Sequence, residues 1–237
     1  MRILLILLLF LGMMAPTHAT PPRVIYVEEH IAGQTADQIF IFRRVTDNLG
    51  LHHTLWTDLL LIGRDNRTGA ETGRWPVMSV LDNSPWFADY GQTQRTRDKT
   101  PKGRIDPFAF LAERGAWQIL PGSVPWLIEQ ASLNDSGIEI VDGSGGVTHR
   151  LGWAAITKSI AADIGATEAA LEERPTHGGG GALVLPALNA EHCKVGAVHR
   201  YTMKLEPYLA GHAVRLDCSD EDEMTGIQVF LIVPPVQ

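Results

Sequence analysis

Apolar and polar side chains alternate from one position to the next through the last fifty residues of the chain. Tyr201, Met203 and Leu205 alternate with Arg200, Thr202 and Lys204, and the segments 212–218 and 227–233 repeat the pattern. A period of two is the side-chain period of a β-strand that buries one face and turns the other toward water. The pattern therefore predicts a C-terminal antiparallel β-meander.

The two cysteines fall on the buried parity of this meander. Cys193 shares the parity of Tyr201, and Cys218 shares that of Val214 and Leu216. Both sulfurs are thus expected on the inner face of neighbouring strands, where a disulfide can join them. A bridge that closes a loop of this length is expected to stabilise the fold by about 3–4 kcal/mol. We predict a Cys193–Cys218 disulfide.

The same register predicts a pair of histidines. Opposed residues in a regular antiparallel ladder have a constant index sum, so Cys193 opposite Cys218 places His199 opposite His212 on the inner face. Paired imidazoles on adjacent strands can ligate zinc or copper, although such a site needs three or four ligands. His199 and His212 are therefore a candidate metal site, and the alternative is two hydrogen-bonded histidines lining a sheet. No other cofactor is expected.

This register has one weakness, which is its turn. It centres the turn on Leu205–Glu206, whereas the segment 207–211 has better turn chemistry. A bulge at Gly211 would reconcile the two positions.

The first nineteen residues have the pattern of a cleavable secretory signal peptide. Arg2 precedes an apolar run that starts at Ile3, and Thr17 and Ala19 supply the small residues of a cleavage site. The apolar block is shorter than the roughly 20 residues that a membrane span needs. We expect cleavage after Ala19 and a periplasmic or extracellular protein, in a compartment where disulfides persist.

Composition limits the partners of the remaining chain. Without residues 1–19 it has 237 − 19 = 218 residues and a formal charge of 19 − 27 = −8. An acidic protein repels nucleic acid and anionic lipid, so neither is an expected partner. No later apolar run approaches the length of a membrane span. We expect one globular domain over residues 20–237, with a possible sub-boundary near 142–150 and a glycine-rich connector at 176–181.

Local patterns predict further strands and two helical regions. The runs 24–27 and 39–45 indicate short strands, and 51–62 with 74–81 indicate a hairpin around a turn at 65–69, with Pro76 at an edge or bulge. Asp106 and Pro107 favour a helix start. Isoleucines at helical spacing predict a helical corner near 151–174, in which Gly165 ends the first helix. The predicted fold is α+β, dominated by an antiparallel sheet.

A basic loop is the strongest surface charge feature. Five cations lie close together in the sequence, namely Arg95, Arg97, Lys99, Lys102 and Arg104. They are a candidate binding site for an anionic envelope polymer or an acidic partner. The alternative is an ordinary solvated loop.

No complete catalytic motif supports an enzymatic function. The run His177–Gly180 resembles the backbone-donor loop of lipases and esterases, but no Gly-x-Ser-x-Gly nucleophile elbow accompanies it. Three functional classes remain. The first is a non-catalytic protein that binds a partner protein or an envelope component. The second is an envelope hydrolase, metal-dependent through His199 and His212, and the third is a carbohydrate-binding module with a coplanar row of exposed tryptophans.

Overall fold

The structure is a computed structural model that describes residues 23–50, 55–82, 96–98, 101–118, 130–142, 144–171, 183–184, 186–202, 210–220 and 225–236. The signal-like residues 1–19 and the glycine-rich segment 176–181 lie outside these ranges. The strands are β1 (Arg23–Gln34), β2 (Gln38–Asp47), β3 (Leu55–Asp65), β4 (Glu71–Asp82), β5 (Thr96–Asp98), β6 (Trp117–Gln118), β7 (Ala131–Asn134), β8 (Gly137–Val141), β9 (Val147–Gly152), β10 (Leu183–Val184), β11 (Cys193–Thr202), β12 (Ala210–Ser219) and β13 (Gly226–Val233). The helices are α2 (Pro107–Glu113) and α4 (Trp153–Leu171).

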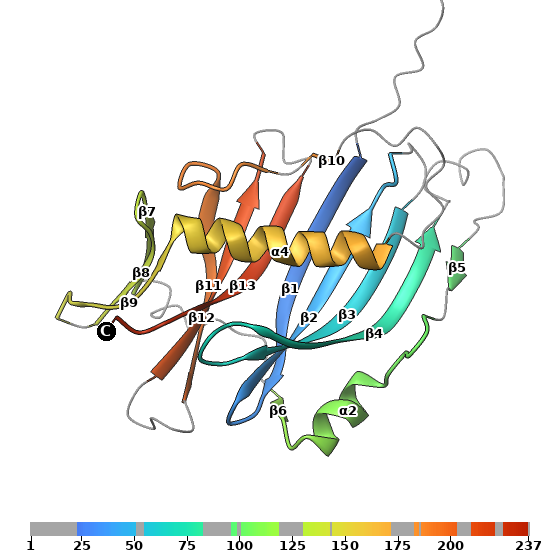
Figure 1. The fold of residues 1–237 in the computed structure, drawn as a ribbon, viewed down its shortest axis with the longest axis horizontal. Coiled ribbons are helices and arrows are strands. Elements are labelled where there is room, and N and C mark those ends of the chain that lie inside the picture. Colours follow the sequence, from blue (N-terminus) through green and yellow to red (C-terminus); the bar gives the residue numbers. More distant parts are fainter. Residues whose placement is uncertain are drawn as a thin grey trace, which may run out of the picture.

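One large sheet dominates the molecule (Figure 1). Its strand order is β11-β12-β13-β1-β2-β3-β4-β5, with β10 and β6 also paired to β1, and β7-β8-β9 form a separate small sheet. Neighbours are antiparallel except at β1, which runs parallel to β13 and to β10. This strand-rich architecture confirms the predicted α+β class with a dominant antiparallel sheet, and β11-β12-β13 form the predicted C-terminal meander.

The contact between β1 and β13 is short. Tyr26, Val27 and Glu28 pair with Gly226, Ile227 and Gln228, and no further register positions follow among the described residues. After Glu28 and Gln228, the half formed by β11–β13 and the half formed by β1–β5 contact each other through side chains. A core cluster joins Ile39 and Ile41 of β2 to Ala213, Phe230 and Ile232 of β12 and β13. The sheet is therefore continuous at Tyr26–Glu28 of β1, and after Glu28 its two halves separate.

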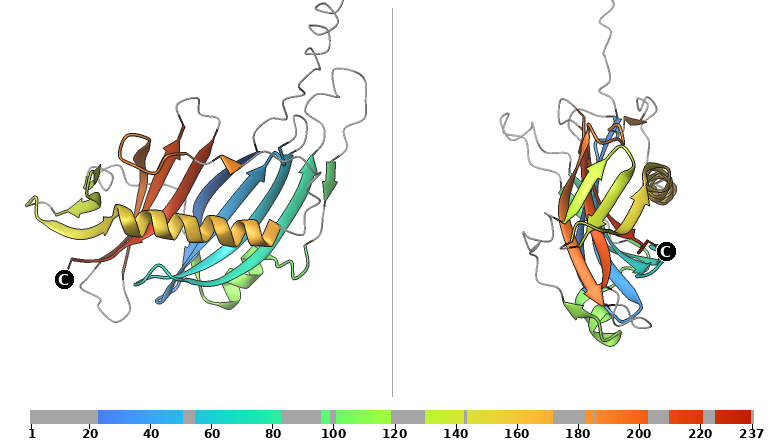
Figure 2. Two further views of the ribbon diagram at one scale, coloured as in Figure 1. Left: turned by 45° about the horizontal axis from the view of Figure 1, so that its top comes forward. Right: turned by 90° about the vertical axis from the view of Figure 1, so that its left-hand side faces the viewer.

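Helix α4 lies across one face of the sheet (Figures 1 and 2). Ile156, Ile160 and Ile164 are spaced four apart and are buried in the largest core cluster with strand residues such as Val45 and Leu216. The predicted apolar stripe is thus the face that α4 buries. The predicted break at Gly165 is wrong, because one helix continues to Leu171. A helical glycine costs only about 1 kcal/mol relative to alanine, which the packed isoleucine face can outweigh.

Local turn and cap chemistry follows the sequence. β3 and β4 form the predicted hairpin, and the Asp65 carboxylate accepts hydrogen bonds from the Arg67 and Thr68 amides in its turn. Pro76 lies beside a register shift, as expected for a proline within a sheet. Asp106 caps α2 through the amides of Phe108 and Ala109. Within the predicted sub-boundary near 142–150, residue 143 lies outside the described residues, and 147–150 are the start of β9.

Neither described helix has the length and apolar character needed to cross a membrane.

Candidate functional site

The predicted disulfide is confirmed. Cys193 and Cys218 are bridged as directly opposed residues of β11 and β12, with a Cα–Cα distance of 4.0 Å. Both cysteines are buried in the core cluster that α4 covers. The bridge therefore joins the start of β11 to the end of β12 on the sheet face that packs against α4.

The predicted pairing of His199 with His212 is wrong. The register has the expected sum from Cys193 to Val195, but a bulge between Val195 and Ala197 shifts it by one residue. Beyond the bulge, His199 lies opposite Ala213, and His212 lies opposite Arg200. Because opposed residues share a face and neighbours alternate, the two histidines point to opposite faces of the sheet.

Gly196 makes this bulge possible. A Cβ atom at position 196 would lie 2.1 Å from Oδ2 of Asp217, so the carboxylate occupies the space of a side chain. A glycine inside an otherwise regular strand is a known sign of a bulge or a close approach. This glycine is the sequence signal that predicts the register shift.

The partner of His212 is His149 on β9. Nδ1 of His212 and Nε2 of His149 are 3.4 Å apart, and the two buried rings meet edge to face. Burial and the neighbouring His149 lower the pKa of His212 to about 4. His199 instead contacts Gln34, and burial lowers its pKa as well. Within the described residues, no group of three or more His, Cys, Asp or Glu side chains is placed to hold a metal ion.

The structure describes only part of the predicted basic loop. Arg95 and Lys99 lie outside the described residues. Arg97 lies on β5, and its backbone pairs with that of Leu81 on β4. Lys102 and Arg104 are exposed on the segment that precedes α2. A shared anion site on these cations stays a prediction.

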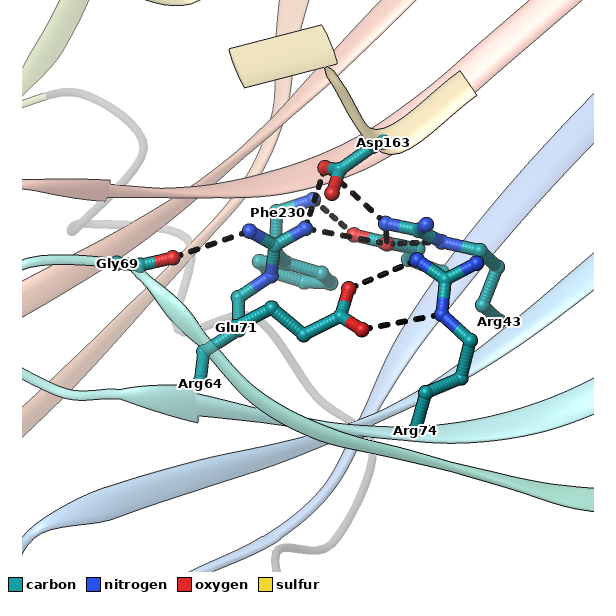
Figure 3. Close-up of polar contacts among 8 residues, drawn as sticks. Arg43, Arg64, Gly69, Glu71, Arg74, Asp163 and Phe230 are labelled. Carbon is teal, nitrogen blue, oxygen red and sulfur yellow. Dashed lines mark hydrogen bonds and ion pairs between the residues drawn. The ribbon is translucent and has the colours of Figure 1, made fainter. Parts of the chain in front are cut away.

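A buried charge cluster lies between the sheet and α4 (Figure 3). Nε of Arg43 is 2.7 Å from Oε1 of Glu29, and Nη2 of Arg64 is 2.5 Å from Oδ2 of Asp163. Arg43 also contacts Asp163 at 3.2 Å, and all four residues are at most 8 % exposed. Burial acts to lower the pKa of Arg43, but the carboxylates of Glu29 and Asp163 raise it.

This cluster balances two acids against two bases and joins three strands to the helix. Sequence reasoning missed it, although a signal exists. Glu29 has the parity of the buried Ile25 and Val27, and Arg43 has the parity of the buried Ile41 and Val45. A charged residue at a core position of a strand indicates a buried partner. The mutual pairing makes this cluster an anchor for α4.

The opposite face of the sheet carries a polar row that crosses five strands. Pairings run from β11 to β12, β13, β1 and β2 at one level of the sheet. In this order the row is Lys194, Asp217, Gln228, Glu28 and Arg44. We call these residues the polar row. Its members alternate in sequence with core residues that face α4, so the row lies on the sheet face away from that helix.

A hollow is formed at the disulfide end of the polar row. Two adjoining cavities, of about 300 and 230 Å³, share Lys194, Asp217 and Ser219 in their linings. Tyr26 and Gln228 line the smaller cavity. The larger cavity is also lined by residues near the start of β11 and the end of β12, namely Glu191, His192, Cys193 and Asp220. We call the joined cavities the polar hollow.

Tyr26 forms the aromatic wall of the polar hollow. Its ring lies against Gly226 on the adjacent strand, where an added Cβ would be 2.2 Å from Cε2 of the tyrosine. Tyr26 is nevertheless 36 % exposed. Because Gly226 has no side chain, the Tyr26 ring packs directly on the backbone of β13, and part of the ring surface stays exposed to solvent.

The charges around the polar row are compensated in pairs. Arg215 donates two hydrogen bonds to Asp217, at 2.7 and 3.0 Å. Glu28 accepts from Arg44 and lies 2.9 Å from Nε2 of His30. Burial acts to raise the pKa of Glu28, but His30 and Arg44 hold it below its usual value. Both carboxylates of the row are therefore already paired with cations.

Comparisons of the chain with protein-family models, with curated proteins and with solved structures find no match.

Proposed function

We propose that the chain is a non-catalytic binding protein that works outside the cytoplasm and holds a component of the cell envelope in the polar hollow. The observation that carries this proposal is the polar row together with the cavities at its end. Five strands contribute neighbouring polar side chains to one face, and β-sheet backbone fixes their spacing. Concave sites with a few convergent polar groups are the usual form of ligand-binding sites.

The compartment rests on two features. The Cys193–Cys218 disulfide fits an oxidising environment, because thiols are kept reduced in the cytosol. The first nineteen residues have the sequence pattern of a secretory signal. An envelope component is the class of ligand that such a compartment supplies.

The electrostatics of the polar row favour binding over catalysis. An ionised carboxylate can only accept hydrogen bonds, and Asp217 already accepts two from Arg215. General acid–base catalysis needs a group whose pKa lies near the working pH, whereas the pKa of Glu28 is lowered away from neutrality. These side chains are arranged as fixed partners for a bound molecule.

Co-sedimentation with an isolated envelope fraction, containing cell wall and membranes, tests the proposal. Wild-type protein should pellet with the fraction in a saturable way, and Lys194→Ala combined with Asp217→Asn should reduce the bound amount at least tenfold. Lys158→Ala, on the exposed side of α4 and on the other side of the sheet, is the matched control. A double variant with unchanged unfolding midpoint and wild-type binding would overturn the proposal.

A further inference from the structure

We infer that the ligand of the polar hollow is a neutral glycan whose sugar units carry free vicinal hydroxyls, with one pyranose ring packed on Tyr26 and its hydroxyls bound by the adjoining polar row. This inference rests on the proposed function, because it assigns the chemical class of the ligand at the same site. It differs from the prediction of a tryptophan platform. Among the described tryptophans, Trp75 packs on Phe40 and Phe110, and the indole N–H groups of Trp56 and Trp153 donate to Ser79 and to the Asn134 carbonyl.

The first argument is the aromatic surface. Tyr26 holds a fixed position against Gly226 and keeps 36 % of its surface exposed beside the cavity. The face of an aromatic ring carries partial negative charge. A pyranose ring has a face of C–H groups with partial positive charge, so the two surfaces attract each other while the sugar hydroxyls stay at the edge.

The second argument is the mixture of hydrogen-bonding groups next to that ring. Lys194 only donates, Asp217 only accepts, and Gln228 and Ser219 do both. A sugar hydroxyl is both donor and acceptor, so a row of hydroxyls can satisfy such a mixture. A purely apolar ligand would leave these polar groups without partners, which is unfavourable.

The third argument is charge. Asp217 is paired with Arg215, and Glu28 with Arg44 and His30, so an ionic ligand would have to compete with existing ion pairs. Phosphate-binding and carboxylate-binding sites concentrate unpaired arginine or backbone donors instead. Lys194 adds a cation to the lining of the hollow, and Glu191 and Asp220 add carboxylates. Charges of both signs therefore surround the ligand, which favours a neutral molecule over a headgroup of one sign.

The fourth argument is shape. The two cavities share three lining residues and extend in different directions from them, one toward Tyr26 and one toward His192. The joined hollow is elongated along the strand ends. This form fits consecutive sugar units of a chain better than a compact ligand.

Chemical treatment of the envelope fraction before co-sedimentation tests the ligand class. Periodate cleaves the vicinal diols of sugars, and proteinase K removes proteins. We expect periodate to abolish binding of the wild-type protein and proteinase K to leave it unchanged. Tyr26→Ala should weaken binding to the untreated fraction at least tenfold, whereas Tyr26→Phe, which keeps the ring, should bind within twofold of wild type.

The outcomes separate this inference from the proposed function. Binding that depends on Lys194 and Asp217 but survives periodate, or disappears after proteinase K, would overturn the glycan and leave the binding function intact. Equal binding by Tyr26→Ala and wild type, at equal unfolding midpoints, would also overturn the glycan. No binding of wild-type protein to the untreated fraction would overturn the proposed function itself.

Discussion

The carboxylate of Glu29 accepts a hydrogen bond from the backbone N–H of Phe230, with an Oε2–N distance of 2.6 Å. The paired segment of β1 and β13 ends at Glu28 and Gln228, so this side chain satisfies a backbone donor next to the point where ladder pairing stops. The other carboxylate oxygen of Glu29 binds Arg43. Glu29 thus bonds both to the backbone of β13, where the two halves of the sheet separate, and to the charge cluster between the sheet and α4.

Glu29→Gln is expected to destabilise the protein strongly. The change leaves one carboxylate, Asp163, to balance the two guanidinium groups of Arg43 and Arg64, and breaking a buried ion pair typically costs about 3–5 kcal/mol. Urea unfolding followed by circular dichroism measures the effect. The control is Glu139→Gln, which breaks a more exposed pair with Arg150 on the small sheet and should cost far less, because exposed ion pairs contribute little to stability. Equal losses for the two variants would contradict the role of the buried cluster.

Gly226→Ala tests whether the Tyr26 ring packs on Gly226. The added methyl group would lie 2.2 Å from Cε2 of Tyr26, so the ring has to move. Overpacking of this kind costs about 1–3 kcal/mol. In a Tyr26→Ala background the methyl has room, and Gly226→Ala should then be close to neutral. A double-mutant cycle on the free energy of unfolding measures this coupling, and additive losses would show that the ring does not rest on Gly226.

Cys193→Ser should lower the free energy of unfolding by about 2–5 kcal/mol, the usual loss when a native disulfide is removed from a small secreted domain. The reason is that the unfolded chain regains the freedom of a loop with a sequence separation of 25. Urea unfolding without reductant gives the value. In the same conditions, thiol titration of the denatured wild-type chain should find no reactive sulfhydryl, and two free thiols would contradict the bridge.

Stability should fall as the pH drops from about 6.5 toward 4. The pKa of His212 is about 4 in the folded protein, against 6.5 for the unconstrained side chain. Between these values the unfolded chain binds a proton that the folded chain does not, so acidification favours unfolding. The neutral form contributes fully above pH 6.5, and the contribution lost is at most about 3 kcal/mol, since one pKa unit corresponds to about 1.4 kcal/mol.

Urea midpoints between pH 7 and pH 4.5 measure this dependence. His212→Gln removes this titrating group and should reduce the slope in that window, with the lowered pKa of His199 accounting for a remaining part. Ser132→Ala is the control, because it changes an exposed position of β7 without a titrating group and should leave the slope unchanged. Identical slopes for wild type and His212→Gln would show that the His149–His212 contact does not resist protonation.

The sequence by itself determined the features that depend on neighbouring residues. The alternation after Cys193 predicted the strands of the meander and the buried face of Cys218, and Asp65 and Asp106 specified a turn and a helix start. The parity that Cys193 shares with Tyr201 is lost at the bulge, so these two residues lie on opposite faces of the sheet although Cys193 is buried as expected. The isoleucine stripe identified the buried face of α4. Each of these follows from local geometry, because side-chain period, turn and cap chemistry act within a few residues.

Tertiary structure alone decided the parts that join distant segments. The central pairing of β1 with β13 and the Glu29–Phe230 hydrogen bond span about two hundred positions, with a separation of 201 for the latter. The bulge at Gly196 placed His199 and His212 on opposite faces of the sheet. Packing of the isoleucine face stabilised α4 as one helix that includes Gly165. The polar row exists only once five strands are in register. Periodicity says which face a residue occupies, but a shift of one residue in pairing changes every opposing partner, and only the folded contacts fix that register.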